Sequence, residues 1–373
     1  MASAASRIFA LALLSHAPLC GVAAEVPARV APTRPGTMPP PPALAPASAL
    51  AVRKFGAIDY VALADVATRL GLKLAWVQRG RTVSLSGPAA RAELENGSRD
   101  ISINGLRVFL GDPVLAAGGQ LFVGRIDYER CLAPQLRPGY GALPLPVPKT
   151  VVLDPGHGGN DPGTSANEKV YALDVARRVQ KILTAFGLRV VLTRDADVSL
   201  SLAERSGAAN AARADLFVSI HFNAVANDTK ASGVEVYTFA PRMQHSTGWS
   251  PLAKKSDPDL ETADMPVNRF DHWNVVLAQS IHRWFVSDLK TVDRGRKLAH
   301  WGMLRGLECP GVLVECGFLT STAEAKKIAT PAHRQRIAEA IAAGIRDYAT
   351  IVGSLQSKPA AAAAPVSPRF PSG

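Results

Sequence analysis

Two patterns of apolar residues divide the chain. From residue 150 onward, short apolar runs typical of buried strands alternate with segments in which apolar residues recur at helical spacing. The predicted strands begin at Val151, Arg189, Leu216, Val234 and Gly311, and the predicted helices cover about Glu168–Phe186, Asn274–Leu289 and Pro331–Val352. This alternation indicates an α/β fold over residues 150–353, with a twisted, mostly parallel or mixed sheet flanked by helices.

Local signals set two helix boundaries in this region. Ser201 and Glu204 have the spacing of a capping box, so we expect a helix to begin there. Gly187 follows the last apolar position of the helix that starts at Glu168, and glycine commonly ends helices. These signals support the α/β assignment.

Residues 53–142 have a different pattern. Short alternating runs over 82–86, 101–103, 107–110 and 121–123 predict strands, and Leu63, Val66 and Leu70 lie at helical spacing. Asn104-Gly105 stands between two of the strand runs, as expected of a tight hairpin turn. We therefore predict a small α+β domain that precedes the α/β domain.

The outer segments predict export and flexibility. Arg7 precedes the apolar run Ile8–Leu14, and the small residues at 22–24 suit a signal-peptide cleavage site, so residues 1–24 are predicted to be a signal peptide. Residues 25–52 are rich in proline and alanine and predict a linker, and residues 354–373 predict a disordered tail. We expect a secreted protein of the periplasm or cell envelope, without stable membrane insertion.

Charge and cysteine content exclude some classes of protein. The net charge is +11, but residues 151–353 carry 24 basic against 22 acidic residues, so the excess lies mostly outside the predicted α/β domain. A nucleic-acid enzyme would more often concentrate positive charge along its cleft, and we interpret the excess as mild attraction to an anionic surface. Four cysteines in 373 residues exclude a disulfide scaffold, and we expect Cys131, Cys309 and Cys316 to be buried free thiols.

Two histidines are placed at strand ends. His157 lies in a glycine-rich turn directly after the strand that begins at Val151, and His221 ends the strand that begins at Leu216. The turn lacks the spacing of a phosphate-binding loop. Because functional groups gather where the carboxyl ends of strands meet, the two histidines suggest a metal site.

Two glutamates complete a hydrolytic set. Glu168 lies in the first turn of the helix after the glycine-rich turn; this position also suits a carboxylate that only complements the helix dipole. Glu315 ends an apolar strand, where an unpaired carboxylate is costly, and structural ion pairing is its simpler alternative. His157, Glu168 and His221 match the two-His, one-Glu ligand set of catalytic zinc sites, with Glu315 as general base.

The same residues carry a family resemblance. Asp154–Gly159, Glu168, Leu192–Asp195, Leu202–Arg205, Ser219–Asn223 and Val314–Leu319 resemble motifs of the zinc-dependent N-acetylmuramoyl-L-alanine amidases, in order over about residues 150–350. The resemblance implies that His157, Glu168 and His221 bind Zn²⁺ and that Glu315 is catalytic. In the region of about residues 55–140, Asp59–Leu63, Ala75–Val77, Ile103–Gly105 and Leu121–Val123, in this order, more distantly resemble the copper amine oxidase N-terminal-like domain of envelope proteins.

The resemblance implies a function and leaves alternatives open. We expect a peptidoglycan hydrolase that cleaves the amide between N-acetylmuramic acid and L-alanine of the stem peptide, in cell-wall remodelling or daughter-cell separation. The alternatives are another secreted zinc peptidase or amidohydrolase, and a peptidoglycan-binding protein without catalytic activity. We expect a monomer with no nucleic-acid ligand; a regulatory protein partner stays open.

The segment Ala240–Trp273 interrupts the motif order. It is rich in acidic residues, among them Glu261, and lies between a strand and a helix of the predicted α/β domain. Some related amidases hold an inhibitory helix in a comparable insertion, so the resemblance suggests a lid in which a carboxylate such as Glu261 reaches the metal. The alternative is a passive wall of the substrate groove.

Overall fold

The fold is described from a computed structural model, over residues 50–88, 90–165, 167–249 and 260–356. The predicted signal peptide, residues 25–49 of the predicted linker and residues 357–373 of the predicted tail lie outside these residues. Residues 354–356, predicted as part of the tail, are instead the last residues of a helix that begins at Pro331. In the described part, no helix combines the length and the apolar character needed to cross a membrane.

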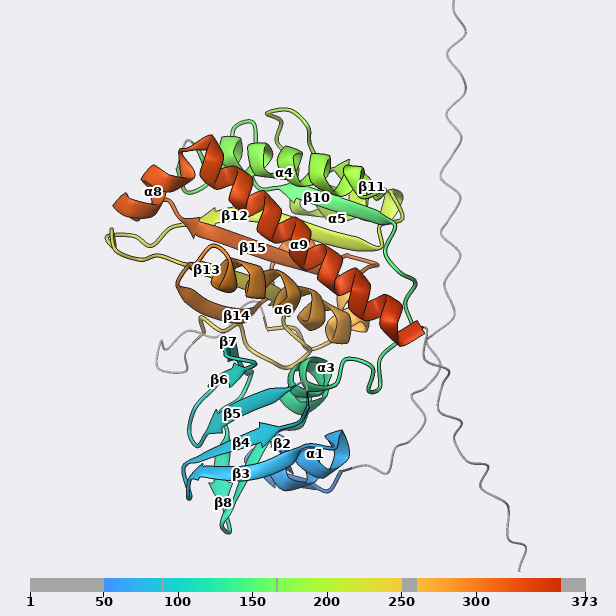
Figure 1. Cartoon of the computed structure of the whole chain (residues 1–373), viewed down its shortest axis with the longest axis vertical. Helices are drawn as coiled ribbons and strands as arrows, with labels where there is room; N and C mark the ends of the chain where they lie inside the picture. Colours follow the sequence, from blue (N-terminus) through green and yellow to red (C-terminus); the bar gives the residue numbers. More distant parts are fainter. Residues whose placement is uncertain (1–49, 89, 166, 250–259, 357–373) are drawn as a thin grey trace, which may run out of the picture. The chain divides into compact units, whose positions relative to one another are not determined.

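The N-terminal part contains nine strands (Figure 1), and its buried apolar side chains form two clusters. The strands are β1 (Val52–Phe55), β2 (Ile58–Ala62), β3 (Lys73–Gln78), β4 (Thr82–Ser86), β5 (Arg91–Glu95), β6 (Asp100–Ile103), β7 (Leu106–Phe109), β8 (Leu115–Ala117) and β9 (Gln120–Gly124). The helix α1 (Leu63–Leu70) buries Leu63, Val66 and Leu70, as their spacing predicts. A helical stretch that the sequence pattern did not reveal covers α2 (Arg125–Asp127), η1 (Tyr128–Leu132) and α3 (Ala133–Leu136).

The predicted hairpin turn is confirmed. β6 and β7 pair in antiparallel fashion, with Ile103 opposite Leu106. Asn104 and Gly105 between them have φ values of 54° and 78°. Two successive positive φ values are what a type I′ turn requires, and asparagine and glycine tolerate them best.

The C-terminal part is the predicted α/β layer fold. Its strands are β10 (Thr150–Pro155), β11 (Arg189–Leu192), β12 (Leu216–Asn223), β13 (Val234–Phe239), β14 (Asp293–Ala299) and β15 (Gly311–Phe318). Its helices are α4 (Glu168–Ala185), α5 (Leu202–Ala211), η3 (Pro266–Phe270), α6 (Asp271–Ser287), α7 (Gly302–Arg305), α8 (Thr322–Ile328) and α9 (Pro331–Gln356). The helix predicted to begin near Asn274 thus begins three residues earlier, and β14 was missed.

Helices cover both faces of this sheet (Figure 1). Side chains of α4, α6 and α9 form one apolar cluster with one face of the strands. Residues of α5 and α7 pack with the opposite face, where Val152, Phe217 and Leu313 lie. The capping box at the start of α5 is present, because Ser201 and Glu204 each bond the other's backbone amide.

One sheet passes through both parts of the chain. Its strand order is β11-β10-β12-β15-β13-β14-β7-β6-β5-β4-β3. β10, β11, β12 and β15 are parallel, β13 runs antiparallel to β15, and β14 is parallel to β13 and to β7. The sheet is therefore mixed, and β14 joins the two parts through the pair Arg296 and Val108.

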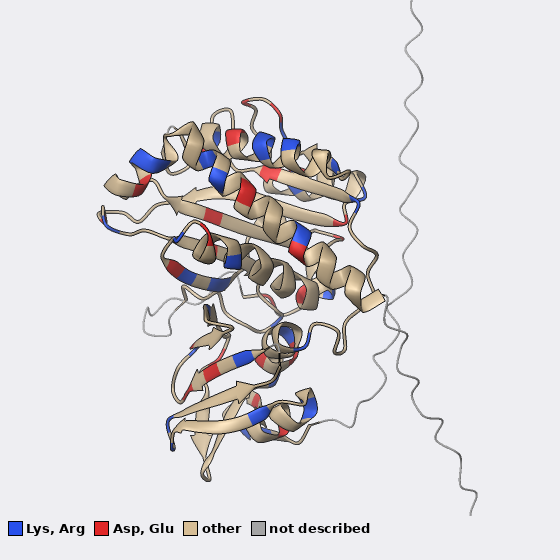
Figure 2. Ribbon diagram, viewed as in Figure 1, with Lys and Arg blue, Asp and Glu red and all other residues tan. Residues whose placement is uncertain are grey.

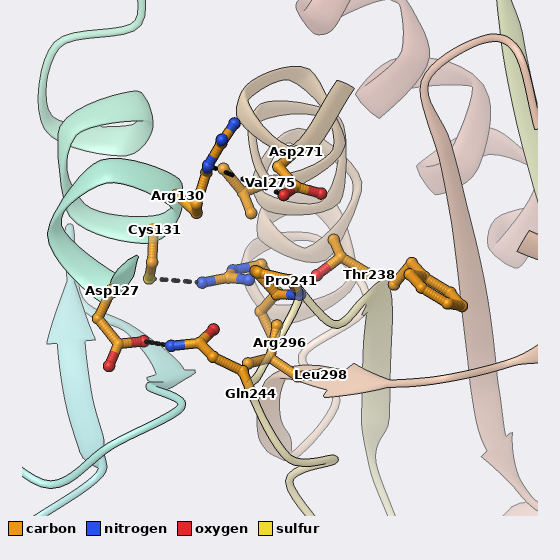
Figure 3. A pocket seen from close by; sticks show the side chains of 11 residues that line it. Asp127, Arg130, Cys131, Thr238, Pro241, Gln244, Asp271, Val275, Arg296 and Leu298 are labelled. Carbon is orange, nitrogen blue, oxygen red and sulfur yellow. Dashed lines mark hydrogen bonds and ion pairs between the residues drawn. The ribbon is translucent and has the colours of Figure 1, made fainter. Parts of the chain in front are cut away.

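Buried polar contacts reinforce this junction (Figure 3). Arg296 is fully buried, and its Nη2 donates to the Cys131 sulfur at 2.8 Å. Gln244 Nε2 donates to Asp127 Oδ1 at 2.9 Å, and the same carboxylate accepts from the amides of Gly111 and Asp112. Burial raises the pKa of Asp127 to about 6. The junction between the two parts therefore contains ionisable groups that are buried away from solvent.

Candidate metal and catalytic centre

Two arginines fix the turn that carries His157. Arg205 donates to the carbonyl oxygens of Pro155 and His157 at 2.9 and 3.0 Å. Arg194 donates to the carbonyl oxygens of Pro155 and Gly156 at 3.0 and 2.7 Å. His157 itself has a φ of 59°, an uncommon value for a residue with a side chain, so the turn needs such support.

A buried carboxylate anchors one of these arginines. Asp154 is fully buried at the end of β10, and its Oδ1 lies 2.7 Å from Arg205 Nη1. Thr193 and Ser219 donate to the same carboxylate at 2.6 and 2.8 Å. The Asp154 charge is therefore both paired and hydrogen-bonded, which is the condition for a buried ion.

Glycine at 156 lets the two histidines approach each other. A Cβ at this position would lie 2.3 Å from Cε1 of the His221 ring. Real Cβ atoms do not approach another atom so closely, so any larger residue would displace His221 or the turn.

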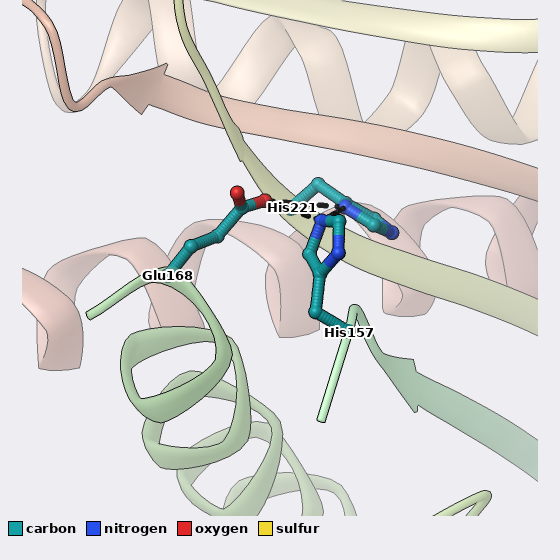
Figure 4. Close-up of side chains that lie close together, drawn as sticks. All are labelled: His157, Glu168 and His221. Atoms are coloured by element: carbon teal, nitrogen blue, oxygen red, sulfur yellow. Dashed lines mark hydrogen bonds and ion pairs between the residues drawn. The ribbon is translucent and has the colours of Figure 1, made fainter. Parts of the chain in front are cut away.

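The structure brings together the three predicted metal ligands (Figure 4). His157 Nε2 and Glu168 Oε1 are 3.1 Å apart, His221 Nδ1 and Glu168 Oε1 are 3.3 Å apart, and the two nitrogens are 3.1 Å apart. Ligands bound tetrahedrally to zinc at about 2.0–2.1 Å lie about 3.3–3.4 Å from one another. The donor set and its spacing therefore fit a zinc ion.

Further contacts orient these side chains. Asp161 Oδ2 lies 2.8 Å from His157 Nδ1, the arrangement in which a carboxylate fixes a ligating imidazole. Glu168 is 1% exposed, and its Oε2 accepts from the amide and hydroxyl of Thr164 at 2.6 and 2.8 Å. Burial acts to raise the pKa of Glu168, but hydrogen bonds from the two histidines outweigh it and hold this pKa below its usual range.

Glu315 lies next to this cluster in the sheet. It is directly opposite His221 in the β12–β15 ladder and directly opposite Glu235 in the β15–β13 ladder. Its Oε2 is buried and has no hydrogen-bond partner among the described residues. Burial, followed by the nearby charges of Glu168 and Glu235, raises the pKa of Glu315 well above its usual range.

Glu235 is a residue that sequence reasoning missed. It is 2% exposed, and its carboxylate accepts from Arg294 Nε at 2.8 Å and from Lys297 Nζ at 2.6 Å. Asn223 and the Tyr237 hydroxyl donate to it as well. The sequence predicts a strand that begins at Val234. A glutamate within this otherwise apolar run is the only sequence feature that could have pointed to Glu235.

Other candidates lie away from the centre. Among the described residues, His157, Glu168 and His221 form the only group of three side chains that could hold a metal. Glu261 forms an ion pair with Arg305 rather than joining this group, which contradicts the predicted contact between Glu261 and the metal. The arginine charge already neutralises this carboxylate.

Three of the six remaining histidines, and the cysteines, have other surroundings. His245 stacks on Trp249, His282 bonds Asp293 at 2.7 Å, and His272 bonds the Pro138 carbonyl, whereas His16 lies outside the described residues. The cysteine prediction is confirmed, since Cys131, Cys309 and Cys316 are free and buried.

Comparisons with known proteins show which family this chain resembles. Residues 151–347 match the family described as N-acetylmuramoyl-L-alanine amidase. LytC of Bacillus subtilis is 34% identical over 206 residues, which cover 54% of this chain and 36% of LytC. AmiA of Escherichia coli is 32% identical over 220 residues, which cover 54% of this chain and 76% of AmiA.

A solved structure, amidase AmiC2 of Nostoc punctiforme, is 31% identical, with 53% of this chain and 96% of that chain covered and a TM-score of 0.44. The chain spans little more than a third of the length of the first curated relatives that it matches. The matched region contains all four predicted site residues and more than half of the chain. This protein therefore belongs to the N-acetylmuramoyl-L-alanine amidase family.

Proposed function

We propose that the protein is a zinc-dependent peptidoglycan hydrolase that cleaves the amide between N-acetylmuramic acid and the L-alanine of the stem peptide. The observation that carries this proposal is the convergence of His157 Nε2, His221 Nδ1 and Glu168 Oε1 to within 3.3 Å of one another. Family membership supports the bond that is cleaved. We infer that this chemistry takes place in the cell envelope.

In this proposal His157, Glu168 and His221 hold the metal. Zinc, when bound, supplies Lewis-acid chemistry that polarises an amide carbonyl and acidifies water. Asp161 keeps the His157 ring oriented through its Nδ1, and Thr164 fixes the second oxygen of Glu168. The glycine-rich turn and the first turn of α4 therefore hold the metal-ligand atoms of His157 and Glu168 in position.

Glu315 is proposed to move protons. Its carboxylate lies one strand from His221 and has an oxygen without a partner among the described residues. In its ionised form, which the charge of a zinc ion held by His157, Glu168 and His221 would favour, this carboxylate could accept a proton from attacking water. The same oxygen could then deliver the proton to the departing amine nitrogen of L-alanine. The ion pairs of Glu235 with Arg294 and Lys297 keep a second carboxylate beside it charge-balanced.

Product analysis tests the reaction. The full chain, loaded with zinc, would be incubated with a purified disaccharide-tripeptide, and the products would be identified by mass spectrometry. We expect a free peptide with L-alanine at its amino terminus and a disaccharide with a free lactyl carboxyl group. Cleavage between two amino acids of the stem would instead identify a zinc peptidase.

Metal dependence separates the enzyme from a wall-binding protein. Removal of zinc with a chelator should abolish product formation, and added zinc should restore it. His157→Ala and His221→Ala should lose zinc and activity together, because each removes one of three protein ligands. His333→Ala, on α9, is the control. Binding to sacculi without any product would favour the non-catalytic alternative.

A further inference from the structure

Polar side chains of the catalytic centre continue along one face of the sheet. His221, Glu315 and Glu235 are opposite one another on β12, β15 and β13. Residues opposite one another in a sheet project from the same face. This face is the one on which Phe217, Leu313 and Tyr237 lie, away from the helices α4, α6 and α9.

β14 carries this face onto the N-terminal part. Lys297 is opposite Tyr237, and its Nζ lies 5.9 Å from the Tyr237 ring centre and 5.8 Å from that of Phe109 on β7. Phe109 is in turn opposite Asp100 on β6. The side of the sheet that holds Glu315 therefore becomes the outward side of β7 and β6.

A groove lies on this outward side. Its volume is about 440 Å³, and polar side chains dominate its lining. Those on the N-terminal strands are Thr82, Glu93, Glu95, Asp100, Ser102 and Arg107. Asp293, the first residue of β14, also lines it, and the next residue, Arg294, bonds Glu235 opposite Glu315. Asp293 and Arg294, adjacent in β14, thus connect the groove with the strand pair that holds Glu315.

Arginines pair with three of the four carboxylates that line the groove. Arg81 pairs with Glu95 at 2.7 Å, Arg91 with Glu93 at 2.6 Å, and Arg107 with Asp100 at 2.6 Å. Figure 2 shows basic and acidic residues interspersed over the ribbon rather than gathered on one element. Because these carboxylates are paired with arginines, the groove should not attract a polyanion. Its carboxylate and hydroxyl oxygens can still accept hydrogen bonds from the hydroxyl groups of a ligand. This chemistry suits a polysaccharide.

We propose that this groove binds the glycan of a peptidoglycan strand whose stem peptide occupies the catalytic centre, so that the N-terminal part forms a distal subsite of the same substrate surface. The inference rests on the proposed function. Five strand spacings separate β15 from β5, about 24 Å at about 4.8 Å each, whereas an extended tripeptide reaches about 10 Å. Only a polymeric substrate can occupy both sites.

Comparison of polymer with monomer tests the proposal. The specificity constant kcat/KM would be measured for soluble glycan strands that carry stem peptides and for a single disaccharide-tripeptide, with the full, zinc-loaded chain. Ser102→Trp fills the groove, and Glu93→Gln with Glu95→Gln removes two carboxylates. In both variants the polymer-to-monomer ratio of kcat/KM should fall about tenfold, which corresponds to about 1.4 kcal/mol.

Thr68→Trp is the matched control. Thr68 is exposed on α1, outside the groove, so this change adds a similar bulk without touching the groove. A ratio in both groove variants equal to that of Thr68→Trp would overturn the proposal. Circular dichroism would check folding, and the milder double glutamine variant keeps the test valid if Ser102→Trp misfolds.

Binding gives a second readout. In a Glu315→Gln background, affinity for the uncleaved soluble strands should weaken about tenfold with Ser102→Trp, again about 1.4 kcal/mol, and stay unchanged with Thr68→Trp. Unchanged affinity in both would contradict the subsite. A wild-type chain that cleaves neither substrate would instead refute the proposed function, so the two failures are distinguishable.

Discussion

His221 and Glu315 are direct neighbours across the parallel ladder of β12 and β15, the first of them at the predicted metal cluster and the second outside it. The sheet register therefore fixes the spacing between the proposed ligand and the proposed proton carrier. Neither side chain depends on a loop for this relationship. The first prediction below tests whether metal binding and proton transfer belong to different residues, and the others test the surroundings of the site and the stability of the fold.

Replacement of Glu315 by glutamine should separate catalysis from metal binding. Because Glu315 is assigned proton transfer rather than coordination, we expect turnover to fall by about 10²–10⁴-fold while zinc stays stoichiometric. Product formation and metal content would be measured on the same preparation. Glu308→Gln, at an exposed glutamate, is the control. Retained turnover in Glu315→Gln would refute the assigned role.

Replacement of Gly156 by alanine should disturb the metal site through sterics alone. The new Cβ would lie 2.3 Å from the His221 ring, so the ring or the turn must move and zinc content should drop. Gly207→Ala, in α5, meets no atom within 4 Å and should keep zinc. Equal zinc content in the two variants would show that the centre tolerates the shift.

Replacement of Arg205 by alanine should lower the free energy of unfolding by about 3–5 kcal/mol, because Asp154 would keep a buried charge without its partner. Arg336→Ala, which removes an exposed pair with Asp288 at 3.9 Å, should cost less than about 1 kcal/mol. Denaturant unfolding would compare them. Similar losses in both variants would contradict the role of the buried pair.

Stability should decrease with rising pH because of Asp271. Burial raises the pKa of this carboxyl to about 7, so between pH 4 and 7 the native state holds a proton that the unfolded chain has released. Over this window the free energy of unfolding should lose on the order of 4 kcal/mol from this group. Asp271→Asn should flatten that slope relative to wild type, measured by urea unfolding at pH 5 and pH 8. An unchanged slope would show that Asp271 does not ionise there.

Structural features that depend on neighbouring residues in the sequence could be predicted. The turn at Asn104-Gly105, the capping box at Ser201 and the helix through Glu168 depend on residues close in sequence, and all are present. His157 and His221 could be named because each follows a strand. Their proximity in space then follows from the adjacent pairing of β10 and β12.

Long-range pairing was not predictable in the same way. β14 has the sequence Asp293-Arg-Gly-Arg-Lys-Leu-Ala299, whose charges hide a strand that lies inside the sheet. Partners far away in the chain make these charges acceptable: Glu235 pairs with Arg294 and Lys297, and Cys131 contacts Arg296. The pattern of apolar and polar residues in β14 does not indicate that such partners exist.

The junction of β14 with β7 bears on how the protein can be divided in the laboratory. A fragment that starts near residue 150 would leave one side of β14 without its neighbouring strand. It would also strip the cover from the Arg296 side chain, which Cys131 contacts in the whole protein. Bare strand edges template association between chains. Truncation near residue 150, at the boundary between the two parts, should therefore yield a fragment prone to aggregation.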